Sequence, residues 1–397
     1  MLKKRGLSHR EDKRQKLVDS LSIIRISLNR LLLSVFKCCL LKRNIENNLS
    51  SYSNLSNMKM HENEIKTRQG TIACPSSELD LGVTLKGGQS FRWFSHNDGY
   101  RGIFDGCVWT LTQNETHLFY VVHGPLLDSK NYDEILSQYF RLDVSLQDLC
   151  KKWSAEDQNF EKSLNKTNGV RILSQEVIEN VFSFICSSNN NIQRISGMVE
   201  KLCSFFGEKI CSIEDKDYYN FPSIEALAGK DVEMKLKEEK FGYRAGYIAN
   251  AAKKLVELGG RQWLLNLHKE NDISYGKARE QLITLPGIGP KVADCICLMS
   301  LGHLEAIPVD THIFQIAREN YLPHLGKQKT VTPKIHEEIS SHLRELWGPL
   351  AGWAQAVVFC AKINDTSVTM LNQKRKISTN EKPEKRGPKK LPIKEKF

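Results

Sequence analysis

Short aromatic and β-branched runs alternate with turn residues between about residues 75 and 125. Runs of this length and composition predict strands, and the short turns between them (HNDG, Asp-Gly and Gln-Asn-Glu) predict antiparallel hairpins. Because no helix-length segment separates the runs, the pattern argues against a dinucleotide-binding α/β fold. The runs are SFRWF (90–94), YRGIF (100–104), CVWTL (107–111) and HLFYVV (117–122).

From about residue 133 onward, apolar positions recur with helical spacing. The stripe from Val177 to Ile185 predicts a helix with Ser174 as its N-cap, and a second stripe from Ile192 to Phe206 follows the polar loop SSNNN. The fold class is therefore α+β, with an antiparallel sheet domain at 61–150 and an α-helical region at 151–365. Further helices are predicted at 224–256, 275–285, 291–301, 311–320, 333–346 and 351–361.

Basic residues concentrate at the two ends of the 397-residue chain. Residues 1–60 hold 13 basic against 4 acidic side chains and residues 371–397 hold 10 against 3, whereas residues 61–370 have a net charge of −5. A body that binds nucleic acid must therefore use a local patch rather than its overall charge. Residues 366–397 are predicted to be a basic disordered tail, and 1–60 a disordered extension or a mitochondrial presequence. The expected location is the nucleus, with the mitochondrion as the alternative.

The eleven cysteines include no CxxC pair, which indicates reduced thiols rather than a disulfide framework. Cys295 and Cys297 are too close together to form a zinc site by themselves, so no metal site is predicted. The longest apolar stretch near the N-terminus is interrupted by Lys37, well short of the about eighteen residues that a membrane span needs. No membrane segment is predicted, and without heptads or another dimerisation signal a monomer is expected.

The segment LPGIGPK (285–291) joins two of the predicted helices. Gly287 and Gly289 lack a Cβ, so their backbone amides can approach an anion closely. The N-terminus of the following helix adds the positive end of its dipole, and a DNA phosphate is the natural ligand. An ordinary helix–helix turn explains the two glycines equally well.

Two charged residues near this hairpin form a candidate catalytic pair. Lys291 lies in the first turn of a helix whose later residues, VADCICLM, are almost wholly apolar. Near the positive end of a helix and beside apolar surface, the ammonium loses stability relative to the neutral amine, so Lys291 is a candidate nucleophile. Asp310 precedes another predicted helix, and it can cap that helix or face a developing cation. Each residue alone fits a structural role, and the case for catalysis rests on the pair.

These motifs resemble the helix-hairpin-helix DNA glycosylases, and over about 75–365 the chain is similar to the eukaryotic 8-oxoguanine DNA glycosylases. The resemblance implies a base-excision-repair enzyme that flips 8-oxoguanine paired with cytosine out of damaged double-stranded DNA. It further implies removal of the base through a lysine Schiff base, followed by strand cleavage. Six motifs occur in the order of that family: GGQSFRW (87–93), FSFICSSNNNIQRI (182–195), GYRA (242–245), LPGIGPKVADCICLM (285–299), PVDTH (308–312) and WGPLAGWAQAVVF (347–359).

The resemblance also implies roles for individual residues. Lys291 is implied to be the nucleophile, Asp310 to stabilise positive charge on the sugar, and His312 to contact a phosphate. A backbone carbonyl, a thiol, an amide and a ring are implied to form the base pocket: Gly88, Cys295, Gln355 and Phe359. A second group is implied to fill the gap left by the base and to read the orphaned cytosine: Asn189, Arg194, Tyr243 and Arg244.

Some relatives carry an iron–sulfur cluster on four closely spaced cysteines near the C-terminus. Here only Cys360 follows Cys297, so no cluster and no other cofactor is expected. Two alternative functions remain. A different base specificity is disfavoured by the implied base pocket, and a non-catalytic helix-hairpin-helix DNA-binding module has no need for Lys291 paired with Asp310.

Overall fold

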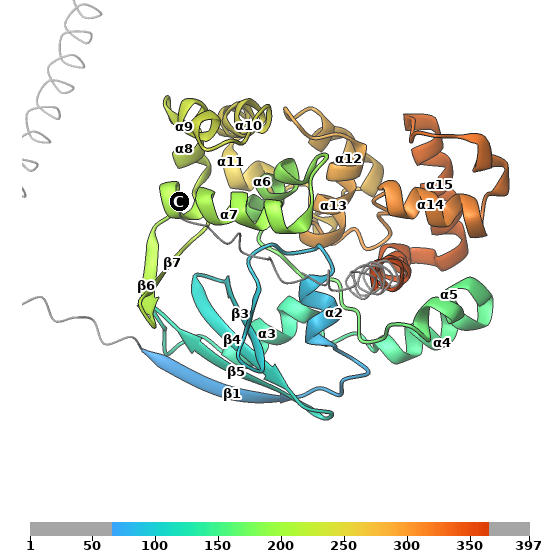
Figure 1. Ribbon diagram of the computed structural model, residues 1–397, viewed down its shortest axis with the longest axis horizontal. Helices are drawn as coiled ribbons and strands as arrows, with labels where there is room; N and C mark the ends of the chain where they lie inside the picture. The colour runs from blue at the N-terminus through green and yellow to red at the C-terminus, as the bar shows by residue number, and fades with distance from the viewer. Residues whose placement is uncertain (1–65, 365–397) are drawn as a thin grey trace, which may run out of the picture. The chain divides into compact units, whose positions relative to one another are not determined.

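The computed structural model describes residues 66–364, which are coloured in Figure 1. The basic segments predicted at 1–60 and 366–397 lie outside the described residues. In the part of the chain that is described, no helix is long and apolar enough to cross a membrane.

The sheet has five antiparallel strands in the order β1-β5-β4-β3-β2 (Figure 1). Each of β2, β3 and β4 pairs with the next strand along the chain, as the short turns predicted. The turn between β3 and β4 has Asp105 and Gly106 with positive φ, the combination that tight hairpins favour. The antiparallel sheet is therefore confirmed. Its strands are Thr67–Ala73 (β1), Phe94–His96 (β2), Gly99–Phe104 (β3), Cys107–Gln113 (β4) and His117–His123 (β5).

A helical region follows the sheet, which confirms the α+β class. Three helices come directly after it: Tyr132–Phe140 (α3), Leu146–Glu156 (α4) and Gln158–Leu164 (α5). The next six are Val177–Ser187 (α6), Ile192–Phe206 (α7), Ile224–Leu227 (α8), Val232–Glu238 (α9), Arg244–Leu258 (α10) and Gly260–Leu265 (α11). The last labelled α-helices are Tyr275–Ile283 (α12), Pro290–Ser300 (α13), Thr311–Asn320 (α14) and Pro333–Trp347 (α15), and residues 351–364 are helical.

The sheet region differs from its sequence prediction at three places. The run 90–94 forms a strand only from Phe94 onward, because Phe91 packs edge-on against Phe184 of α6, with ring centroids 5.6 Å apart. Residues Leu81–Lys86 form a short helix (α2), which Asp80 caps. Strand β1 was not predicted from the sequence, because its residues TRQGTIA alternate between exposed and half-buried positions and include few large apolar side chains.

The helical region also contains corrections. Ser174 is not the N-cap of α6; Glu176 is, because its carboxylate accepts hydrogen bonds from the amides of Ile178 and Glu179. The single helix predicted at 224–256 is three helices, α8 to α10, separated at Gly229 and at Gly242, which has φ +62°. A two-stranded hairpin was missed, Lys209–Ile213 (β6) with Lys216–Tyr219 (β7).

Two main clusters of buried side chains form the core, one from the sheet with α2 and α3, the other from α4 onward. Arg171 lies between them and is 1% exposed. Its guanidinium pairs with Glu78 at 2.6 Å and donates to the carbonyls of Arg141 and Val144 at 2.9 and 2.6 Å. The boundary predicted between 150 and 151 stays a prediction.

Arg171→Ala should lower the free energy of unfolding by about 3–5 kcal/mol, because it leaves a half-buried Glu78 and several carbonyls without their donor. The matched control is Arg68→Ala, which removes an exposed pair with Asp128 and should cost less than about 1 kcal/mol. Urea unfolding of the two variants and the wild type measures both values. Equal losses would contradict the assigned role of Arg171.

Candidate active site

The hairpin 285–289 connects α12 to α13 through a tight turn. Gly287 has φ +81°, and a Cβ at this position would lie 2.7 Å from Cβ of Tyr247. Gly289 is the N-cap of α13 with an extended backbone, and a Cβ there would meet nothing within 4 Å. The two glycines therefore differ. Only glycine fits at position 287, because of its positive φ and the close approach of Tyr247, whereas Gly289 leaves open space at the start of α13.

Helix α13 is held by a buried carboxylate that the sequence analysis missed. Asp294 is fully buried, and its oxygens lie 2.6 Å from the Tyr275 hydroxyl, 2.8 Å from Arg279 Nε and 3.0 Å from His336 Nε2. Burial, with the charge of Asp294 as the second cause, raises the pKa of Tyr275. These contacts tie α13 to α12 and α15. A charged residue in an otherwise apolar helix was the only signal for this network in the sequence.

Lys291 lies in the first turn of α13 and is half-buried. Its Nζ is 4.9 Å from the centroid of the Phe184 ring, a cation–π contact. One turn later on the same helix, Cys295 is buried. Burial raises the pKa of the Cys295 thiol to about 11, and the charge and hydrogen bond of Lys291 oppose that rise. Lys291 and Cys295 are therefore direct neighbours.

Asp310 is the N-cap of α14, which confirms the structural role considered from the sequence. Its Oδ1 accepts a hydrogen bond of 2.8 Å from the amide of Ile313. Its Oδ2 accepts none from the described residues. The cap therefore fixes the carboxylate while one oxygen remains available.

A small cavity of about 50 Å³ brings the predicted residues together. Lys291 and Asp310 both line it, and so do all four residues of the implied base pocket: Gly88, Cys295, Gln355 and Phe359. His312 lies beside this group, since its ring contacts the Phe359 ring edge-on at a centroid distance of 5.9 Å.

Gly88 reaches the cavity on a loop from the sheet side of the molecule. It has φ +76°, and its carbonyl accepts no hydrogen bond from the described residues. The next residue, Gln89, holds the loop in place: its side chain bonds the backbone of Arg171 at 2.7 Å and of Leu173 at 3.0 Å. A free carbonyl is thus presented by a loop that side-chain hydrogen bonds hold in place.

The residues implied to read the opposite strand gather in a second place. Asn189 and Arg194 are exposed, and Tyr243 is 53% exposed while its hydroxyl donates to the Ser188 carbonyl at 3.0 Å. Arg244 differs, because it is 3% exposed and its guanidinium donates to the carbonyls of Ser188 and Asn189. In this structure Arg244 therefore holds the 188–189 loop.

Comparison with known proteins identifies the family. Residues 71–181 match the model of the 8-oxoguanine DNA glycosylase N-terminal domain, and residues 182–348 match that of the HhH-GPD superfamily base excision DNA repair proteins. An N-glycosylase/DNA lyase of Saccharomyces cerevisiae is 37% identical over 334 residues, which cover 75% of this chain and 87% of the yeast protein. The chain belongs to the 8-oxoguanine DNA glycosylase family.

Other members of this glycosylase family agree. An N-glycosylase/DNA lyase of Arabidopsis thaliana is 36% identical over 292 residues, which cover 72% of this chain and 78% of the plant protein. An 8-oxoguanine glycosylase/lyase of Clostridium acetobutylicum, solved with double-stranded DNA containing cytosine opposite 8-oxoguanine, has a TM-score of 0.65 and 26% identity; the match covers 77% of this chain and 99% of that one. The glycosylase is accordingly of the bifunctional N-glycosylase/DNA lyase class.

Within residues 66–364 of this glycosylase, no group of three or more His, Cys, Asp or Glu side chains could hold a metal ion. The cysteines described there are free thiols. The expectation of a cofactor-free enzyme stays a prediction.

Gly287→Ala in this glycosylase should lower the free energy of unfolding by about 1–3 kcal/mol, because alanine is strained at positive φ and its Cβ would clash with Tyr247. Gly289→Ala is the matched control and should change stability by less than about 0.5 kcal/mol. Urea unfolding of both variants measures the difference. A loss at Gly289 as large as that at Gly287 would show that the hairpin is not as described.

Proposed function

We propose that Lys291 is the nucleophile and Asp310 the charge-stabilising carboxylate of an enzyme that removes 8-oxoguanine paired with cytosine. The observation that carries the proposal is that both side chains line one cavity with Gly88, Cys295, Gln355 and Phe359. A lysine and a carboxylate that line the same small, largely apolar cavity suit attack on a sugar carbon. A module that only binds DNA has no use for this pair.

The proposed reaction begins when the neutral amine of Lys291 attacks C1′ of the damaged nucleotide. The C1′–N9 bond breaks and its electron pair leaves with the base, which takes up a proton, while the positive charge developing on the sugar faces the carboxylate of Asp310. The amine loses a proton and the C1′–O4′ bond opens with a proton going to O4′, which gives a Schiff base. Loss of a proton from C2′ then expels the 3′ phosphate, and water hydrolyses the Schiff base.

Recognition of the base is proposed to depend on the free carbonyl of Gly88. A backbone acceptor at this point can receive the N7–H of 8-oxoguanine, which guanine lacks. Gln355 is proposed to bond the pyrimidine-like edge, with Phe359 and Cys295 on opposite faces of the ring. The cavity of about 50 Å³ is far below the roughly 300 Å³ of the smallest usual ligand pockets, so it must widen when the base enters.

The opposite strand is proposed to meet the second group of residues. Tyr243 is exposed and suits a wedge that fills the gap left by the base, and the exposed Asn189 and Arg194 suit the hydrogen-bonding groups of cytosine. Arg244 can take part only if it releases the carbonyls of Ser188 and Asn189. We therefore assign Arg244 two roles: it holds the 188–189 loop in the free protein, and it contacts the cytosine once DNA is bound.

The DNA backbone is proposed to lie along the start of α13, with the open space at Gly289 admitting a phosphate near the helix dipole. Gly287 contributes its amide and shapes the turn, and His312 contacts a second phosphate. Double-stranded DNA is the proposed partner of a monomer. A nuclear location stays a proposal, and so does the mitochondrial alternative.

Lys291→Gln should abolish 8-oxoguanine release while leaving binding to an 8-oxoguanine:cytosine duplex within about threefold, because it removes the nucleophile but keeps a polar side chain of similar length. Borohydride should trap a covalent protein–DNA adduct with the wild type and none with the variant. Gel electrophoresis of the trapped adduct and a filter-binding assay measure the two effects.

The control for this experiment is Lys151→Gln, which changes an exposed lysine on α4 far along the chain from the site. It should trap as much adduct as the wild type. If Lys291→Gln loses binding and turnover together, Lys291 is structural and the proposal fails. Tight binding without any wild-type adduct would favour a non-catalytic reader or a hydrolytic glycosylase.

A further inference from the structure

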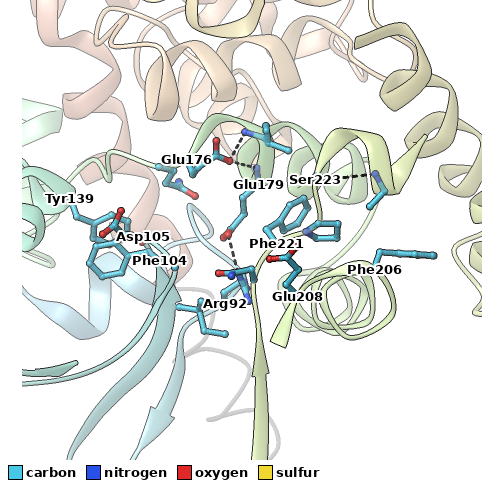
Figure 2. Close-up of a pocket in the computed structure, with 17 residues that line it drawn as sticks. Arg92, Phe104, Asp105, Tyr139, Glu176, Glu179, Phe206, Glu208, Phe221 and Ser223 are labelled. Carbon is cyan, nitrogen blue, oxygen red and sulfur yellow. Dashed lines mark hydrogen bonds and ion pairs between the residues drawn. The ribbon is translucent and has the colours of Figure 1, made fainter. Parts of the chain in front are cut away.

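A second and much larger cavity, of about 530 Å³, lies outside the site described above. Its volume is within the range of small-molecule pockets. Figure 2 shows that aromatic rings stand on two sides of it. Phe104 and Tyr139 are on one side, stacked on each other with centroids 4.1 Å apart, and Phe206 and Phe221 are on the other. Flat apolar walls of this kind suit an aromatic ring.

The cavity is lined by four carboxylates and one cation. Three of the carboxylates have a cationic partner: Asp105 pairs with Lys130, Glu176 with Arg261 and Glu179 with Arg92. Glu208 has no cationic partner among the described residues. Arg92 bonds only Oε2 of Glu179, at 3.1 Å, and Oε1 of Glu179 accepts no hydrogen bond from the described residues. Two carboxylate acceptors therefore remain open to a ligand.

The cation of the cavity is itself incompletely satisfied. Arg92 is 4% exposed, and its guanidinium bonds Glu179 and the carbonyl of Tyr219. Its Nε is buried and has no hydrogen-bond partner among the described residues. An unpaired buried donor costs free energy, which a neutral acceptor oxygen of a ligand recovers if the Arg92 side chain shifts toward it.

We propose that this cavity binds a small aromatic amine, a ligand with a flat ring, one ammonium group and a neutral hydroxyl beside it. The ring would lie between the aromatic walls, and the ammonium would meet Glu208 and the open oxygen of Glu179. The hydroxyl would accept from Arg92 Nε. An anionic ligand is disfavoured because the positive charge of Arg92 is already paired with Glu179, and the carboxylate of Glu208 would repel an anion.

A ligand in this cavity should change how the base pocket binds 8-oxoguanine, an inference that rests on the proposed function. Gln175 lines the large cavity and donates to the carbonyl of Gln89 at 2.9 Å, and Gln89 lines the small cavity. Arg92 belongs to the same loop as Gly88. A cation at the open oxygen of Glu179 shares that carboxylate with Arg92 and weakens its ion pair with Arg92, so it loosens the loop that presents the Gly88 carbonyl. The ligand is therefore an effector that weakens base recognition.

The binding test uses three probes with one skeleton and different charge: 2-amino-1-phenylethanol, 1-phenylethane-1,2-diol and mandelate. Calorimetry with the full chain and no DNA should show the amine binding about tenfold more tightly than the diol, with mandelate weakest. Equal affinities, tightest binding of mandelate, or no binding of any probe would overturn the proposal.

The site is tested with Glu208→Gln, an exposed position that should fold normally. This variant should lose about tenfold in affinity for the amine and nothing for the diol. Glu115→Gln, an exposed carboxylate that does not line the cavity, is the matched control and should bind like the wild type. An equal loss in the two variants would overturn the assignment.

The coupling is tested by single-turnover release of 8-oxoguanine with saturating amine. The rate should fall at least about fivefold in the wild type, and Glu208→Gln should need about tenfold more amine for the same fall. An unchanged wild-type rate with bound amine would overturn the effector role. A wild type without any base release would instead contradict the proposed function, while the binding test would still stand.

Discussion

The buried carboxylate of Asp294 is the constraint on which the geometry of the site depends. Helix α13 is buried from Val292 to Met299, so its position is set by packing and by this one charge. A charge without water needs partners, and Asp294 has Tyr275 on α12 and His336 on α15 within 3.0 Å. Because Lys291 lies one turn before Asp294, the same contacts determine where the amine stands.

The site is assembled from segments that lie far apart in the sequence. Lys291 comes from α13, Asp310 from the cap of α14, Gln355 from the helical residues 351–364 and Gly88 from the sheet side. Helices alone could position the first three. The Gly88 carbonyl needs the sheet, because its loop is held by Gln89 against an extended segment that contains Arg171. The sheet domain therefore serves recognition as well as stability.

The sequence predicted the elements in which large apolar side chains recur with a regular period, such as β5 and α7, because that period reports burial. It failed where both faces are buried: the run 90–94 looks like a strand, but Phe91 packs on α6. Periodicity could not separate α8 from α10, since the breaks depend on backbone angles such as that of Gly242. The resemblance named the residues that line the small cavity. The contacts of Asp294 and the burial of Arg244 are visible only in the folded chain, because partners distant in sequence leave no local pattern.

The small cavity also indicates which part of the site must move. A base cannot enter about 50 Å³, so one wall has to yield. Phe359, Cys295 and Gln355 lie on helices whose backbone hydrogen bonds and buried neighbours oppose displacement. The loop that contains Gly88 has few backbone hydrogen bonds of its own and is held through side chains, chiefly those of Gln89 and Arg92. Loops of this kind open at lower cost than helices, so the free energy of base recognition depends on how firmly these two side chains hold the loop.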